Sequence, residues 1–212
     1  MARSKSSGKW LAEHFTDEFV KRARKEGYRS RAVYKIQEID EHDRLLKPGM
    51  VVVDLGAAPG AWSQYVKQRV GKTGRVVALD VLPTDVMPGI EILQGDFTEE
   101  STLHALINAL GGQPVDLVIS DMAPNISGID SADQARAMYL AELALDFAGR
   151  VLKPGGGFLV KVFQGRGFNE LYKSMQQRFS RVATRKPRAS RARSAEQYLL
   201  ATGFRGIPAD GG

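Results

Sequence analysis

Short apolar segments alternate with helical segments along most of this chain. The segments expected to form strands are 51–56, 74–81, 90–97, 115–123 and 156–163, followed by 181–187 and 196–203. Apolar residues at helical spacing lie between them, at 62–70, 101–110, 132–152 and 168–179. Strands that are apolar on both faces are typical of a parallel sheet covered by helices on each side. The alternation therefore predicts a doubly wound α/β fold with a mostly parallel seven-stranded sheet in one domain.

Two further helices are expected before the first strand, at 10–26 and 30–42. We expect these helices to bind RNA phosphates through the basic residues on or between them, which are Lys21, Arg22, Arg24, Lys25, Arg29 and Arg31. Residues 1–9 are basic and rich in serine, which is typical of a disordered arm. The tail at 206–212 is expected to be flexible. The folded domain is therefore predicted to cover residues 10–205.

Composition excludes several kinds of site. The chain has no cysteine, which excludes disulfides and thiolate metal sites, and its 3 histidines are scattered, so we expect no metal. It has no apolar run of about 18 residues and no apolar stretch after its basic N-terminus, so neither a membrane span nor a secretory signal is expected. We expect a monomeric cytoplasmic protein.

The net charge of +6 is unevenly distributed. Residues 1–35 and 161–212 are strongly basic, whereas residues 36–160 carry more acidic than basic side chains. Basic ends around an acidic middle predict a surface that binds a polyanion, and nucleic acid is favoured over ordinary solubilising charge. The residues expected to contact RNA phosphates are Arg29, Arg31, Lys186, Arg188, Arg191 and Arg193. Tyr28, Tyr34 and Tyr198 are candidates for stacking on bases.

The first strand ends in the glycine-rich turn "DLGAAPGAW" at 54–62. Its spacing is neither the G-x-G-x-x-G of a dinucleotide site nor that of a P-loop. It resembles motif I of S-adenosylmethionine-dependent methyltransferases. Acidic residues at the ends of the next two strands fit the same ligand, because Asp80 can accept hydrogen bonds from ribose hydroxyls and Asp96 from the adenine amine. The predicted cofactor-binding residues are Gly56, Pro59, Gly60, Trp62, Asp80, Asp96, Phe97 and Asp121, with the rings of Trp62 and Phe97 flanking the adenine.

Lys161 interrupts the apolar strand "FLVKVFQ". A lysine is rarely fully buried unless it is paired, because burying an unpartnered ammonium is costly. Asp121 ends the preceding strand in "ISDMAPN", and the usual strand order brings the two strand ends together. We therefore expect Asp121 to pair with Lys161, near the reactive group of the cofactor.

Several motifs together resemble the FtsJ/RrmJ-type ribose 2′-O-methyltransferases. They are "SRAVYKIQEID", "VVDLGAAPGAWSQY", "GDF", "SDMAPNISG", "RAMYLAELAL", "GGGFLVKVFQGRGF" and "SRARSAEQYLLATG", and the resemblance runs from about residue 10 to about residue 205. It implies a Rossmann-like fold, S-adenosylmethionine as cofactor, and methylation of a uridine in 23S rRNA of the large ribosomal subunit. It also implies a catalytic tetrad of Lys35, Asp121, Lys161 and Glu196. The one departure noted is Ala61, where the family's motif I usually has a second glycine.

The tetrad suits the chemistry that the resemblance implies. A ribose hydroxyl must be oriented toward the methyl group and must lose its proton as it attacks. Lys161 is interpreted as the general base, or alternatively as a hydrogen-bond donor that steers the oxygen. The charge of Lys35 favours a neutral amine at Lys161, whereas Asp121 and Glu196 favour the ammonium form, so the sequence leaves both roles open.

Other functions are consistent with parts of the sequence. The same chemistry on tRNA or on an mRNA cap is the nearest enzymatic alternative, although a cap enzyme needs an aromatic guanine pocket for which the chain shows no added segment. A ribosome-assembly factor without catalysis is a second alternative, which the intact tetrad disfavours. A nicotinamide-dependent reductase is a third, which the missing G-x-G-x-x-G disfavours.

Overall fold

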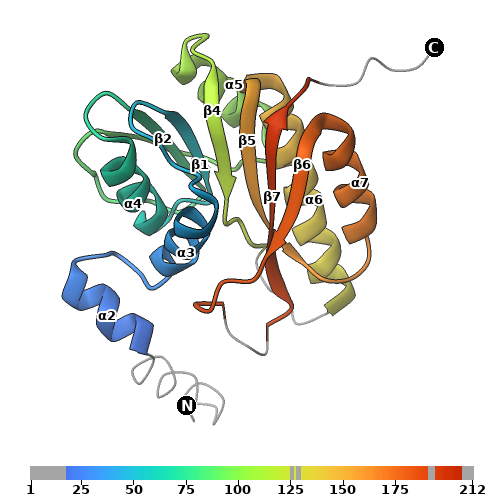
Figure 1. Ribbon diagram of the computed structural model, residues 1–212, viewed down its shortest axis with the longest axis horizontal. Coiled ribbons are helices and arrows are strands. Elements are labelled where there is room, and N and C mark those ends of the chain that lie inside the picture. The colour runs from blue at the N-terminus through green and yellow to red at the C-terminus, as the bar shows by residue number, and fades with distance from the viewer. Residues whose placement is uncertain (1–17, 125–126, 128–129, 191–193, 207–212) are drawn as a thin grey trace.

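The computed structural model describes residues 18–124, 127, 130–190 and 194–206. Its centre is a sheet of seven strands in the order β3-β2-β1-β4-β5-β7-β6 (Figure 1). The strands are β1 (Val51–Leu55), β2 (Arg75–Asp80), β3 (Ile90–Gln94), β4 (Val115–Ser120), β5 (Leu152–Phe163), β6 (Phe179–Arg185) and β7 (Glu196–Phe204). Pairing is parallel from β3 to β5, and β7 is antiparallel to both of its neighbours. The predicted fold class and all seven strands are confirmed.

Helices cover both faces of the sheet (Figure 1). They are α2 (Glu18–Glu26), α3 (Val33–Asp43), α4 (Ala61–Val70), α5 (Glu100–Leu110), α6 (Asp130–Val151) and α7 (Phe168–Arg178). Side chains alternate along each strand, so β1 sends Val52 to a core with α3 and α4, and Val53 and Leu55 to a core with α5, α6 and α7. No helix in the described part of the chain is long and apolar enough to cross a membrane.

The strand order sets where a ligand can bind. β1 and β4 lie side by side although two strands separate them in sequence, so the chain direction across the sheet reverses between them. Ligands of such sheets bind at this point, beyond the carboxyl ends of the strands. Because β7 runs antiparallel to β5, its first residue, Glu196, lies at the same edge and pairs with Phe163 at the end of β5.

The element boundaries differ from expectation at several places. The third strand was expected to reach residue 97 but ends at Gln94, and the sixth lies two residues earlier than expected, at Phe179–Arg185. The fourth strand was expected to reach residue 123 but ends at Ser120, which leaves residues 121–124 as a loop beyond the sheet. The fifth strand begins earlier than expected, at Leu152, and its register with β4 shifts between Val115 and Leu117. The expected helix at 10–26 is described only from Glu18, and the arm at 1–9 and the tail from 207 lie outside the described residues.

Candidate active site

Four charged side chains from four separate parts of the chain meet at the edge of the sheet where β4 and β5 end. Lys161 Nζ lies 3.1 Å from Asp121 Oδ1 and also donates a hydrogen bond to the backbone carbonyl of Asp121. Lys35 Nζ, on α3, lies 2.8 Å from Glu196 Oε1 and 3.9 Å from Asp121 Oδ2. The two ammonium groups thus alternate with the two carboxylates. The structure brings together all four residues of the predicted tetrad.

Sheet register explains how these residues meet. Ser120 at the end of β4 pairs with Val160, which places Asp121 next to Lys161 on the adjacent strand. The expected pairing of Asp121 and Lys161 is therefore confirmed. Only 8% of Lys161 is exposed, so its charge depends on these oxygen partners. An uncompensated ammonium at this depth would destabilise the fold.

The environment keeps Asp121 ionised. Burial is the largest influence and raises its pKa, but the charges of Lys161 and Lys35 and hydrogen bonds from Tyr198 and Lys161 act in the opposite direction. Together they hold the pKa of Asp121 below its ordinary value. Asp121 is therefore an anion throughout the neutral range and can orient both lysines.

Tyr198 is a part of this site that the sequence interpretation assigned differently. It is fully buried, and its hydroxyl donates a 2.7 Å hydrogen bond to Asp121 Oδ1. Its ring packs against Trp62, and Lys35 Nζ lies 5.7 Å from the ring centroid. Stacking of this ring on an RNA base is therefore wrong, and so is stacking by Tyr34, which is 4% exposed. The useful signal was the two-residue spacing from Glu196, which puts both side chains on one face of a strand.

Ser190 is a second residue that the sequence did not indicate. It is buried, and its hydroxyl donates a 2.8 Å hydrogen bond to Glu196 Oε1, the oxygen that also pairs with Lys35. It belongs to a loop between β6 and β7, and no local pattern connects it with the tetrad. Its contact fixes the carboxylate that fixes Lys35.

The glycine-rich turn after β1 is shaped for a close backbone approach. Gly56 and Gly60 have φ values of +77° and +105°, which other residues adopt only with strain. A Cβ on Gly56 would lie 2.7 Å from Met122 Cγ, so the turn packs directly against the loop after β4 that carries Asp121. Position 56 therefore needs glycine for two independent reasons, which are its positive φ and the lack of room for a Cβ.

Two acidic residues border this turn as expected. Both oxygens of Asp80 already accept backbone N–H groups, from Ala58 and Leu82, at 2.8 Å each. Asp96 is exposed and accepts hydrogen bonds from Thr98, which lower its pKa. A carboxylate can accept about four hydrogen bonds, so each retains capacity for a ligand.

Asp54 lies beneath the turn and is completely buried. Ser63 donates a 2.5 Å hydrogen bond to its Oδ2, whereas Oδ1 has no hydrogen-bond partner among the described residues. Burial, with smaller contributions from the charges of Asp121 and Asp80, raises its pKa to about 7. An unsatisfied buried oxygen at the switch point of the sheet, together with the glycine turn and two acids, fits a polar ligand such as S-adenosylmethionine.

Asp54 should make the stability of the ligand-free protein depend on pH. Its pKa in the folded state, about 7, lies above that of an unfolded chain, so its contribution is fully present only below about pH 4 and declines as pH rises to about 7. As pH rises from about 4 to about 7, the free energy of unfolding of the wild type, measured with urea, should therefore fall relative to that of Asp54→Asn. A constant difference between the two proteins from pH 5 to pH 8 would contradict the raised pKa.

The two aromatic rings expected to flank the adenine lie on opposite faces of the sheet. Trp62 is 3% exposed, packs in the core with α3 and α4, and donates a 2.8 Å hydrogen bond to the carbonyl of Ala32. Phe97 belongs to the other core, where its ring meets Phe147 edge-on at 5.7 Å. The expectation that these rings sandwich one ligand is therefore wrong, because core packing uses both. Ligand contact by an edge of either ring stays a prediction.

The predicted RNA-binding residues are only partly available. Arg29 donates to the carbonyls of Pro59, Asp85 and Val86 and so fastens the glycine turn to the loop after β2. Arg31 donates to the carbonyl of Ala189, and Lys186 to those of Ser194 and Glu196. Arg188 is exposed, and Arg191 and Arg193 lie outside the described residues. RNA binding by these residues stays a prediction.

Comparisons with known proteins find similarity to methyltransferases along most of the chain. Residues 28–204 match the family model of the FtsJ-like methyltransferases. The chain is 60% identical over 206 residues to the ribosomal RNA large subunit methyltransferase E of Pseudomonas aeruginosa PAO1, covering 97% of this chain and 100% of that protein. It is 62% identical over 205 residues to the protein of the same name from Azoarcus sp. BH72, with the same coverage of both chains.

A solved structure shows the same architecture. A chain described as a ribosomal RNA methyltransferase of Plasmodium falciparum superposes with a TM-score of 0.75 at 27% identity, covering 84% of this chain and 100% of that one. The family model matches well over half of the chain, and the relatives named above match 97% of it. This chain belongs to the FtsJ-like methyltransferase family.

Proposed function

We propose that this protein transfers the methyl group of S-adenosylmethionine to the ribose 2′-hydroxyl of a uridine in 23S rRNA. The observation that carries the proposal is the position of Lys161, a buried amine held between two oxygens of Asp121 beside the glycine turn. Relatives that are about 60% identical over nearly the full chain are named for methylation of large-subunit rRNA, which supports the substrate.

The residues present fit the cofactor. Asp80 at the end of β2 would accept hydrogen bonds from the ribose hydroxyls, and Asp96 would accept one from the adenine amine. The turn at Gly56 and Gly60 would hold the amino-acid part of the cofactor. When bound, S-adenosylmethionine supplies an electrophilic methyl group on a sulfonium. The turn packs against Met122, next to Asp121, so a cofactor held by this turn would lie at the same edge of the sheet as the tetrad.

Hydrogen-bond counting defines what Lys161 can do. Two of its N–H groups are used by Asp121, one for Oδ1 and one for the backbone carbonyl. The third position is a hydrogen in the ammonium form and a lone pair in the neutral amine. In the ammonium form Lys161 orients the ribose oxygen, and in the neutral form it accepts the proton as the oxygen attacks.

The other members of the tetrad act through position and charge. Lys35, held by Glu196, places a second positive charge beside Asp121. Ser190 and Tyr198 hold Glu196 and Asp121 in turn. A network in which each member fixes the next keeps the amine within the narrow range of positions that proton transfer needs.

The test is methyl transfer from labelled S-adenosylmethionine to large-subunit rRNA from a strain that lacks this enzyme. Methylation of a ribose 2′-oxygen makes the adjacent phosphodiester resistant to alkali, because that oxygen is the nucleophile in alkaline cleavage. We expect label in one alkali-resistant dinucleotide that contains uridine. Label released in single nucleotides would indicate base methylation, and no transfer to rRNA at all would favour an assembly factor or a different RNA substrate.

A further inference from the structure

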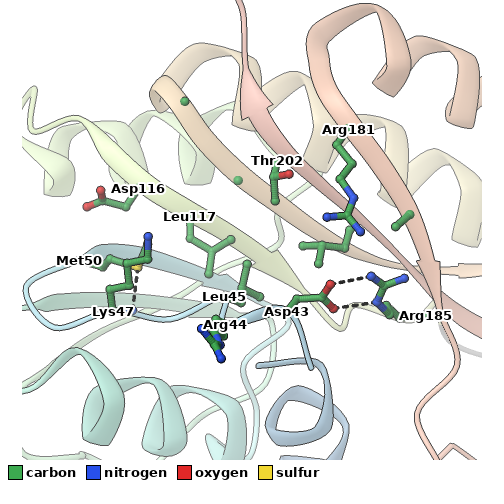
Figure 2. A pocket seen from close by; sticks show the side chains of 14 residues that line it. Asp43, Arg44, Leu45, Lys47, Met50, Asp116, Leu117, Arg181, Arg185 and Thr202 are labelled. Carbon is green, nitrogen blue, oxygen red and sulfur yellow. Dashed lines mark hydrogen bonds and ion pairs between the residues drawn. The ribbon is translucent and has the colours of Figure 1, made fainter. Parts of the chain in front are cut away.

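A cleft of about 270 Å³ opens on the sheet face that carries α3, toward the amino ends of β4 and β5. Figure 2 shows one wall formed by the segment that leaves α3 and the other by Arg181 and Arg185 of β6. Small or uncharged side chains from β5, β6 and β7 form its floor. None of the fourteen lining residues is aromatic.

The two carboxylates in the cleft are already neutralised. Asp43 accepts two hydrogen bonds from the Arg185 guanidinium, at 2.7 Å and 2.5 Å. Asp116 pairs with Lys153 and accepts a 2.7 Å hydrogen bond from the backbone N–H of Val51. Neither acid is therefore available to balance the other positive charges of the cleft.

Three basic side chains remain on the two walls. Arg44 and Lys47 lie on the segment after α3 and Arg181 lies on β6, and all three are exposed. Within the described part of the chain, the side-chain nitrogens of these three residues form no ion pair and no hydrogen bond, and the one side-chain hydrogen bond at Lys47 is donated by its backbone N–H to Met50. Positive charge on both sides of a narrow, uncharged floor attracts an anionic chain lying between the walls.

The cleft and the tetrad lie along the same strands, β6 and β7, with the Asp43–Arg185 ion pair nearest the tetrad. Alternation along β6 puts Arg181 and Arg185 on one face, and Arg185 pairs in register with Tyr198, whose hydroxyl contacts Asp121. Arg181 pairs with Thr202, four residues further along β7, which corresponds to about 13 Å along the strand. A nucleic acid entering the active site can therefore continue along this face.

We propose that this cleft binds backbone phosphates of the RNA substrate at a distance from the methylated nucleotide. The proposal rests on the proposed function for the identity of the polyanion. Charged side chains without aromatic platforms suit phosphate contacts, which fix the position of a nucleic acid, better than they suit base recognition.

The test is the double variant Arg44→Ala/Arg181→Ala, which removes one charge from each wall. Its matched control, Arg150→Ala/Lys173→Ala, removes the same charge from exposed positions on α6 and α7, which cover the opposite face. Affinity is measured by filter binding between about 50 and about 300 mM salt, with unmethylated large-subunit rRNA and with a short uridine-containing oligoribonucleotide.

We expect the double variant to bind rRNA on the order of tenfold more weakly and its salt dependence to fall by about 1.5 in log–log slope, as for two lost phosphate contacts. The control and the affinity for the short oligonucleotide should stay at wild-type values. Equal losses in the double variant and the control, or a wild-type slope in the double variant, would overturn the proposal. Methylation by the wild-type protein is assayed in parallel, so a failure of the proposed function is seen there and not in the binding slopes.

Discussion

Replacing Lys161 by alanine should lower the single-turnover rate of methyl transfer by about 10³-fold, a typical effect of losing a general acid or base. The change removes the only amine that contacts both the carboxylate and the backbone carbonyl of Asp121 in the described part of the chain. Cofactor affinity should remain within a few-fold of wild type, because the glycine turn and Asp80 are untouched. The rate is measured by rapid quench with labelled cofactor, and the affinity by calorimetry.

The companion variant Lys161→Arg keeps the positive charge but can neither become neutral nor accept a proton. A steering role therefore predicts substantial activity in Lys161→Arg, whereas a base role predicts loss as severe as in Lys161→Ala. The pH profile gives an independent reading, since a wild-type rate that is constant from about pH 6 to about pH 10 excludes a titrating amine as the base. Near-normal activity in both variants would remove Lys161 from the mechanism altogether.

The parts of the fold that depend on hydrophobic pattern were predictable from the sequence. Continuous apolar strands separated by helices fix a covered parallel sheet, and the usual strand order then brings Asp121 to Lys161. The position of Lys161 in an apolar strand was enough to predict an acidic partner, because burying an unpaired ammonium is costly. Lys35 and Glu196 needed the family resemblance, since each by itself reads as an exposed charge.

Side-chain destinations within loops and cores were not predictable in the same way. In the sequence, Trp62 directly follows the glycine turn and Phe97 directly follows Asp96. Each ring nevertheless packs in a different core, because burial of a large apolar surface outweighs a ligand contact. The Arg29 guanidinium binds three backbone carbonyls, which the glycine turn and the loop after β2 bring together only in the folded protein. Such contacts join segments that are distant in the sequence, so no periodic pattern of residues predicts them.

Replacing Asp121 by asparagine should affect both stability and catalysis. The substitution leaves Lys161 and Lys35 beside a neutral amide, and removing one partner of a buried ion pair typically costs about 3 kcal/mol. The rate should fall by at least about 10²-fold, because the amine loses the charge that orients it. Urea unfolding and single-turnover methylation measure the two effects on the same preparation.

The pH dependence of that stability loss separates charge from shape. Because the pKa of Asp121 is lowered by folding, its contribution is present above the ordinary pKa of an aspartate and is lost as pH falls through the lowered value. The difference in unfolding free energy between wild type and Asp121→Asn should thus be constant from about pH 5 to about pH 8 and shrink below about pH 4. The control Tyr198→Phe removes a hydrogen bond to the same oxygen without removing charge, so its difference from wild type should be smaller and should change less with pH. A difference for Asp121→Asn that stays constant down to about pH 2 would show that the carboxylate contributes through packing and not through its charge.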